Sequence, residues 1–212
     1  MVIFLFLLLL AIIAVLSRPG IVRQNLFTNA PLDNIQNLIW QRALALVLMV
    51  PMVIIEVASM PAWINFTGKA VWVIAILVVG VPLLAFPLAQ YDKSGPFTEQ
   101  YAGLSAVKGR WGAYLIITVL YMIAYEILLR GTLLHYLVAR FDLAIAIIIN
   151  AAVYSIMHIL KNKREALLSF PLGVLLCGLT VYTKSVWPAV VFHTAMALSF
   201  EFYYSRKSSY VR

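Results

Sequence analysis

The chain has 212 residues, of which 64% are hydrophobic and only 11% are charged. Soluble domains contain roughly half apolar and a quarter charged residues, so this composition excludes an ordinary soluble domain and indicates a polytopic membrane protein. The net charge of +8 is explained by membrane topology and anionic lipid, and no nucleic-acid partner is implied.

Apolar runs predict an all-α membrane bundle of about seven transmembrane helices, because each crossing needs roughly 20 apolar residues. In chain order the predicted spans are 2–16, 38–57, 70–89, 111–134, 143–160, 167–181 and 189–202. The first span has no preceding basic residue and no clear cleavage site, so we interpret it as a retained anchor. The polar loop 90–110 contains helix-breaking Gly and Pro, and it separates amino-terminal anchor helices (1–90) from a four-helix core (111–202) within one membrane domain.

Basic residues alternate between the loops that these spans define. Lys and Arg favour cytoplasmic loops. With the amino terminus outside, the outer loops hold only Lys69, Arg140 and Lys184, and the inner segments hold most of the other basic residues. This alternation predicts a cytoplasmic carboxy terminus.

Four ionisable residues, Glu126, Arg130, His158 and His193, lie within the most apolar spans. Burial of such groups in a membrane is costly, so they usually mark a functional site. Glu126 and Arg130 are four residues apart, which places both side chains on one helix face as an ion pair. The alternative for this pair is a purely structural contact between helices.

One carboxylate and two imidazoles are the ligand set of many catalytic zinc sites, so Glu126, His158 and His193 could bind a divalent metal such as zinc. Alternatively, the carboxylate acts as general base on a water that the imidazoles polarise. Either scheme predicts hydrolysis. The competing interpretations are an interfacial histidine for His158 and a hydrogen bond to a backbone carbonyl for His193.

Three motifs in order resemble the CPBP family, which contains CAAX prenyl endopeptidases and bacteriocin-processing or immunity proteins. Residues 125–131, YEILLRG, resemble the family's EExxxRG motif, and residues 154–158, YSIMH, resemble FxxxH with Tyr154 in place of Phe. The stretch 184–193 is similar to the segment that leads into the third motif, HxxxN. The resemblance covers roughly residues 111–202 and implies an integral protein of the bacterial cytoplasmic membrane.

Two positions depart from the family pattern. The resemblance implies a glutamate that activates water at position 125 and an oxyanion-binding asparagine at position 197, and this chain has Tyr125 and Ala197 there. For Glu126 and Arg130 the resemblance implies an orienting role. Adjacent helical residues point about 100° apart, so Glu126 cannot simply replace its neighbour without a break or rotation of the helix.

Depth along the helices raises a second difficulty. Glu126 lies about 24 Å along its helix from Arg110, whereas His158 lies near the cytoplasmic end of the next span. Simple straight crossings would keep these two residues apart, so we expect a tilted, broken or re-entrant helix.

Two functions remain open from the sequence. The first is an intramembrane endopeptidase that cleaves a peptide or a membrane-associated protein. The second is a catalytically degenerate member that acts as scaffold or regulator of a membrane-protein partner. A transporter is disfavoured because no internal repeat is evident.

Overall fold

The computed structural model describes residues 34–59, 61–91, 111–159 and 163–209, together with residues 8, 11, 12 and 15. The described residues form helices joined by short turns, without any strand. In chain order the helices are α2 (Asn34–Ser59), α3 (Pro61–Ile64), α4 (Gly68–Tyr91), α6 (Trp111–Glu126), η3 (Ile127–Leu133), α7 (Leu134–Val138), α8 (Leu143–Ile159), α9 (Lys163–Thr183) and α10 (Trp187–Ser209). The prediction of an all-α bundle is confirmed.

Five of the six predicted spans beyond residue 34 fall within these helices, and the span 143–160 coincides with α8 except for residue 160, which lies outside the described residues. Within the described part of the chain, four stretches are long and apolar enough to cross a membrane, namely Gln36–Ile55, Gly68–Ala85, Trp111–Val138 and Glu165–Thr183. Helix α8 is apolar but has only 17 residues. The first predicted span lies almost wholly outside the described residues. The count of seven crossings therefore stays a prediction.

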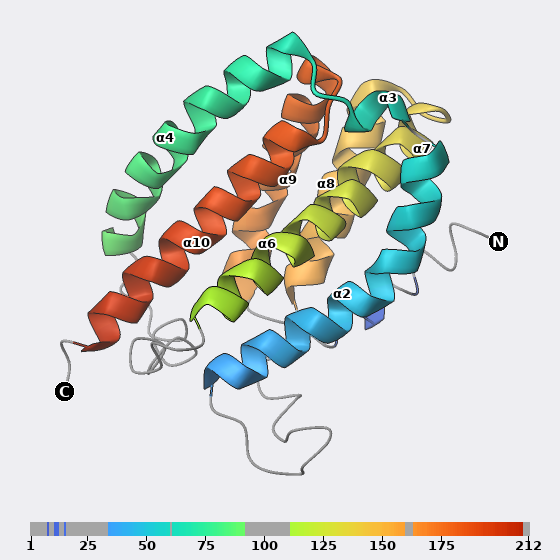
Figure 1. Ribbon diagram of the computed structural model, residues 1–212. Coiled ribbons are helices and arrows are strands. Elements are labelled where there is room, and N and C mark those ends of the chain that lie inside the picture. Colours follow the sequence, from blue (N-terminus) through green and yellow to red (C-terminus); the bar gives the residue numbers. More distant parts are fainter. Residues whose placement is uncertain are drawn as a thin grey trace.

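The helices run up and down along the bundle, so their connections alternate between its two ends (Figure 1). The turns near Ile64, Val138 and Thr183 lie at one end, where α3 is found. The beginnings of α2 and α6 and the end of α10 lie at the opposite end (Figure 1). The described helix ends that adjoin the basic loops are thus on one side of the molecule.

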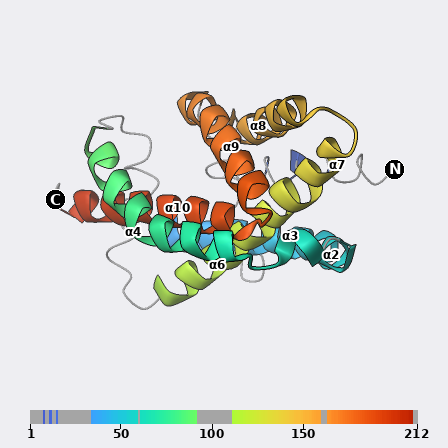
Figure 2. The same cartoon turned by 90° about the horizontal axis from the view of Figure 1, so that it is seen from above.

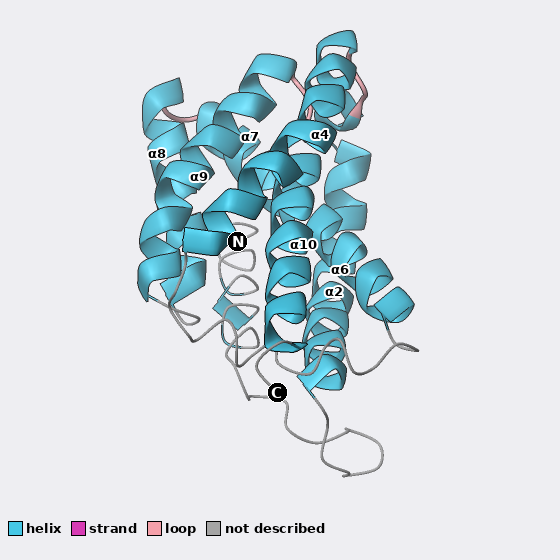
Figure 3. Ribbon diagram, turned by 90° about the vertical axis from the view of Figure 1, so that its left-hand side faces the viewer, coloured by secondary structure: helices cyan, strands magenta, loops and turns pink. Residues whose placement is uncertain are grey.

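Two layers are visible from above (Figure 2). Helices α2, α6, α10 and α4 form a row, and the α8–α9 hairpin packs against one side of it. Figure 3 shows the same helices from the side and shows that they are roughly aligned along one direction. Helix α2 packs on α6 and α4 packs on α10, so both amino-terminal helices are in contact with the predicted core.

The end of the bundle that holds α3 is fixed by polar and aromatic contacts. The Thr67 hydroxyl accepts a hydrogen bond from Ala70 N (3.1 Å) and thus caps the first turn of α4, and it donates to the Thr183 carbonyl at the end of α9 (2.8 Å). Trp187 stacks on Phe66 with 4.9 Å between ring centres, and its indole N–H donates to the Ile64 carbonyl. The connection between α9 and α10 passes through Lys184 with a positive φ of 51°. These contacts set where α10 begins, and α10 carries His193.

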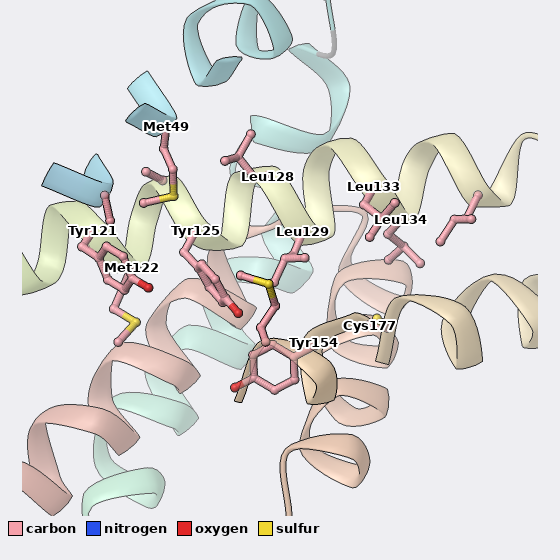
Figure 4. Close-up of a cluster of buried hydrophobic side chains, with 14 of the residues drawn as sticks. Met49, Tyr121, Met122, Tyr125, Leu128, Leu129, Leu133, Leu134, Tyr154 and Cys177 are labelled. Carbon is pink, nitrogen blue, oxygen red and sulfur yellow. The ribbon is translucent and has the colours of Figure 1, made fainter. Parts of the chain in front are cut away.

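The main buried cluster lies between α2, α6, η3, α7, α8 and α9. Figure 4 shows Tyr125 on α6 and Tyr154 on α8, both directed into the interior, with Met49 on α2 on the other side of α6. Gly173 allows α9 to approach α8 closely, since a Cβ there would lie 3.0 Å from Ala151 Cα and 3.1 Å from Tyr154 Cδ1. At Gly173, helix α9 therefore packs directly behind Tyr154.

Candidate functional site

The first motif lies at a change of helix type. Residues Ile127–Leu133 form a π-helix between the α-helices α6 and α7. In this wider turn the Leu134 N–H donates to the Leu129 carbonyl, five residues back. The Asn150 side chain also donates to the Leu129 carbonyl (2.7 Å), and Cys177 Sγ lies 3.2 Å from Asn150 Oδ1. Neighbouring helices α8 and α9 thus hold the π-helix in place. The expected departure from a simple helix is present as a π-helix rather than a break.

Glu126 and Arg130 form the predicted ion pair at this point. Arg130 Nη1 lies 3.3 Å from Glu126 Oε2 and 3.4 Å from Oε1. Both side chains are fully buried. The guanidinium also lies 4.5 Å from the centre of the Tyr154 ring, in a cation–π contact. Arg130 therefore links the first motif to the second.

Glu126 makes a second, shorter contact with His193 on α10. The distance from His193 Nδ1 to Glu126 Oε1 is 2.6 Å, although the residues are 67 positions apart. A carboxylate at this distance fixes the imidazole with its Nδ1–H toward the glutamate. The opposite nitrogen, Nε2, lies 3.3 Å from the Tyr154 hydroxyl. Glu126, His193 and Tyr154 thus form one continuous chain of polar contacts through three helices.

Tyr154 also contacts His158, one turn further along α8. His158 Nδ1 lies 2.9 Å from the Tyr154 carbonyl oxygen, and the two ring centres are 4.6 Å apart. His158 Nε2 lies 3.8 Å from Glu165 Oε1 at the start of α9. The two histidines therefore contact opposite ends of the same residue, His193 at the hydroxyl and His158 at the backbone.

The depth of these residues differs from the expectation for straight crossings. Counted from the turn between α7 and α8, Glu126 is 12 residues below Val138, or about 18 Å, and Tyr154 is 11 residues below Leu143, or about 17 Å. The two are level because each is nearly the same number of residues from that turn. The separation expected for straight crossings therefore does not apply to Glu126 and Tyr154, and the depth of His158 in a membrane stays a prediction.

The two substituted positions are occupied as follows. Tyr125 is almost fully buried, with ring centres 5.8 Å from Tyr121, 6.2 Å from Tyr154 and 6.0 Å from His193. Its aromatic ring fills the space beside His193 that a shorter carboxylate would leave open. Ala197 packs against the main buried cluster. One turn after His193, this position offers no polar group to a substrate.

The donor set does not fit the predicted zinc site. Among the described residues, no group of three His, Cys, Asp or Glu side chains lies close enough to hold a metal ion. The Glu126 carboxylate lies against both Arg130 and His193 Nδ1. A neighbouring guanidinium competes with a metal cation for the same oxygens. These residues form an ion-pair network rather than a metal-binding site.

A second polar cluster was not predicted from the sequence. Arg42 Nη2 on α2 lies 2.5 Å from Glu201 Oε1 on α10, and Arg42 Nη1 donates to the Thr118 hydroxyl on α6. The Arg42 guanidinium also lies 4.7 Å from the Tyr114 ring centre. The available signal was a charged residue within each of two apolar spans. No sequence spacing relates the two, because they are 159 positions apart.

Comparison with known proteins agrees with the motifs. Residues 107–199 match the family model described as type II CAAX prenyl endopeptidase Rce1-like. This segment contains residues 125–131 and 154–158, the stretch similar to the third motif, and both Glu126 and His193. The match supports the assignment to the CPBP family, and the resemblance predicted from the motifs is confirmed. No curated protein and no solved structure gives a significant match to the chain.

Proposed function

We propose that this chain is a CPBP-type intramembrane endopeptidase that hydrolyses a peptide bond beside His158 and His193. The observation that carries the proposal is the 2.6 Å contact between Glu126 and His193, continued by the 3.3 Å contact between His193 Nε2 and the Tyr154 hydroxyl. A carboxylate that orients an imidazole, whose other nitrogen faces a hydroxyl, is a recurring arrangement for proton transfer.

The two histidines take different roles in this mechanism. His158 Nε2 accepts a proton from water, and the resulting hydroxide oxygen adds to the carbonyl carbon of the scissile bond. The carbonyl oxygen becomes an oxyanion, which receives hydrogen bonds from the Tyr154 hydroxyl and from His193 Nε2 when His193 is protonated. The carbon–nitrogen bond then breaks, and the leaving amine takes the proton from His158.

Glu126, Arg130 and Tyr125 act indirectly. Glu126 holds the His193 ring in position through the 2.6 Å contact between its Oε1 and His193 Nδ1. Arg130 holds the Glu126 carboxylate and the Tyr154 ring in position. Tyr125 limits the space around His193. In this scheme Tyr154 supplies the donor that Ala197 lacks.

The description of the matched family suggests a substrate class. We propose a prenylated peptide or membrane-associated protein with a carboxy-terminal CAAX-like sequence. The prenyl group would enter the site sideways from the membrane, and the peptide would reach the site from the cytoplasm. The chain would lie in the bacterial cytoplasmic membrane, with residues 1–90 as anchor, 111–202 as catalytic core and the carboxy terminus in the cytoplasm. Lipid is the permanent partner of its apolar surface.

The test is cleavage of a fluorescence-quenched farnesylated CAAX peptide by the purified protein in lipid nanodiscs. A peptide library analysed by mass spectrometry would extend the search to other sequences. His158→Ala and His193→Ala should each abolish cleavage without loss of the thermal transition. His135→Ala is the matched control, because the His135 ring packs against Trp63 and not against the site. Cleavage unchanged in both site variants would contradict the proposal.

The alternative function is a non-catalytic scaffold or regulator of a membrane-protein partner. It is favoured by one specific observation: Tyr125 occupies the position of the expected base and is buried at 3% exposure. Under this alternative Glu126, Arg130 and His193 only lock helices α6, η3 and α10 together. A parent protein that cleaves no member of the library, and whose cellular function survives both histidine substitutions, would favour the scaffold.

A further inference from the structure

The pair His158 and Glu165 joins the end of α8 to the first turn of α9, and Glu165 lies outside all three motifs. His158 Nε2 and Glu165 Oε1 are 3.8 Å apart. The Glu165 side chain is 25% exposed, whereas those of Glu126 and Arg130 are fully buried. Glu165 is therefore the carboxylate of the site that solvent reaches.

We propose, on the basis of the endopeptidase function above, that Glu165 and His158 together bind and deprotonate the attacking water, so that Glu165 supplies the carboxylate that position 125 lacks. Three observations support this assignment: the tautomer of His158, the spacing of the pair and the access of water.

The tautomer is set by the backbone. His158 Nδ1 lies 2.9 Å from the Tyr154 carbonyl oxygen, which can only accept a hydrogen bond. The Nδ1 atom therefore carries the proton, and Nε2 is the basic nitrogen. This basic nitrogen is the one that faces Glu165.

The spacing suits a shared water. A separation of 3.8 Å is longer than a direct hydrogen bond, and one water placed beside both atoms can donate one proton to Nε2 and the other to the carboxylate. When Nε2 takes the first proton, the negative carboxylate stabilises the imidazolium that forms. The hydroxide oxygen then adds to the carbonyl carbon, and His158 later returns the proton to the amine. Only water and the amide are consumed.

A purely structural role is the competing explanation, since Glu165 lies in the first turn of α9, where a negative charge is favourable. The same turn offers a control. The Ser169 hydroxyl donates to the Glu165 carbonyl oxygen (2.7 Å), so Ser169→Ala perturbs this turn without removing the carboxylate. A helix-stabilising role predicts similar effects for both variants on folding and little effect on turnover.

The experiment measures kcat and KM of Glu165→Gln, Glu165→Asp and Ser169→Ala against the farnesylated CAAX peptide in nanodiscs. We expect Glu165→Gln to lower kcat by about 100-fold or more with little change in KM. Glu165→Asp should recover part of the rate, and Ser169→Ala should retain the parent kcat. Because Gln could disturb α9, Glu165→Ala is also assayed with added formate, which should restore part of the rate by replacing the missing carboxylate.

The outcomes separate this inference from the function on which it rests. Cleavage that requires His158 but proceeds at the parent kcat in Glu165→Gln would overturn the role of Glu165 alone. Equal losses in Glu165→Gln and Ser169→Ala, with no rescue by formate or Asp, would also overturn it and leave a structural role. A parent that cleaves none of the probes would overturn both.

Discussion

Arg42 and Glu201 form an ion pair that joins α2, the first described long helix, to α10, the last. Their side chains are 12% and 6% exposed, with 2.5 Å between Nη2 and Oε1. Arg42 is 8 residues from the start of α2 and Glu201 is 8 residues from the end of α10, so both lie about 12 Å from the same end of the bundle. Glu126 and His193 lie at about twice that depth. The bundle therefore has two polar levels.

The ion pair between Arg42 and Glu201 should contribute to the stability of the fold. Glu201→Gln leaves the largely buried Arg42 charge without this counter-charge, and removal of one partner costs at most the roughly 3–5 kcal/mol typical of a buried pair. We expect a clear decrease of the thermal transition in detergent. Combining Arg42→Met with Glu201→Leu should recover much of the loss, because no buried charge remains. A Glu201→Gln variant that melts like the parent would show that the pair is energetically neutral.

Arg130 should be needed for folding because it neutralises the buried Glu126 carboxylate. Arg130→Ala leaves a fully buried carboxylate with only His193 as partner, at a cost of about 3–5 kcal/mol. The folded yield after purification should fall. Glu126→Gln together with Arg130→Met should restore part of it, since the pair is replaced by neutral groups. The yield of monodisperse protein on gel filtration measures this directly.

Gly173 should be required for the position of Tyr154. A methyl group at this position would lie 3.1 Å from both Ala151 Cβ and Tyr154 Cδ1, so Gly173→Ala should destabilise the protein by about 1–3 kcal/mol through overpacking. Gly178 on the same helix has no atom within 4 Å of such a methyl group. Gly178→Ala should therefore be neutral or stabilising by up to about 1 kcal/mol. Similar melting behaviour of the two variants would refute the close approach of α8 and α9.

The substituted positions can be restored together. Tyr125→Glu with Ala197→Asn reintroduces a base and an oxyanion donor, each of which typically contributes about 100-fold or more. We expect a faster peptide cleavage than in the parent, with a lower melting temperature because the new carboxylate is buried next to Glu126. A double variant that folds but gains no activity would indicate that the site geometry has diverged further.

Membrane orientation can be tested with one reagent. In a Cys177→Ala background, Lys163→Cys and Lys184→Cys place exposed thiols at opposite ends of α9. An impermeant maleimide applied to intact cells should label position 184 and not position 163, because basic loops are retained in the cytoplasm. Labelling at position 163 alone would show that the protein has the opposite orientation.

The sequence predicted helix positions better than helix depths. Apolar runs located six helical stretches, with most of their ends within a few residues. A helix that crosses the hydrocarbon core of a membrane needs such a run. The i,i+4 spacing of Glu126 and Arg130 also predicted a real contact. The sequence left open how Glu126 and the second motif could meet, since the level at which two helices lie side by side depends on how they pack. The contacts of Glu126 with His193 and of Arg42 with Glu201 depend on packing between distant helices, which no local pattern encodes.

The π-helix Ile127–Leu133 makes the site dependent on the number of backbone units as well as on side-chain identity. Its ladder accommodates one residue more than an α-helical turn would. If the same residues formed a regular α-helix, Glu126 would turn by about 100° relative to α7 and point away from His193, although every side chain of the polar chain had been kept. Deleting a single residue from this stretch would instead let a regular α-helix hold Glu126 in nearly its present direction. The direction of Glu126 therefore depends on the match between the wide turn and its residue count, which a comparison of side chains alone would miss.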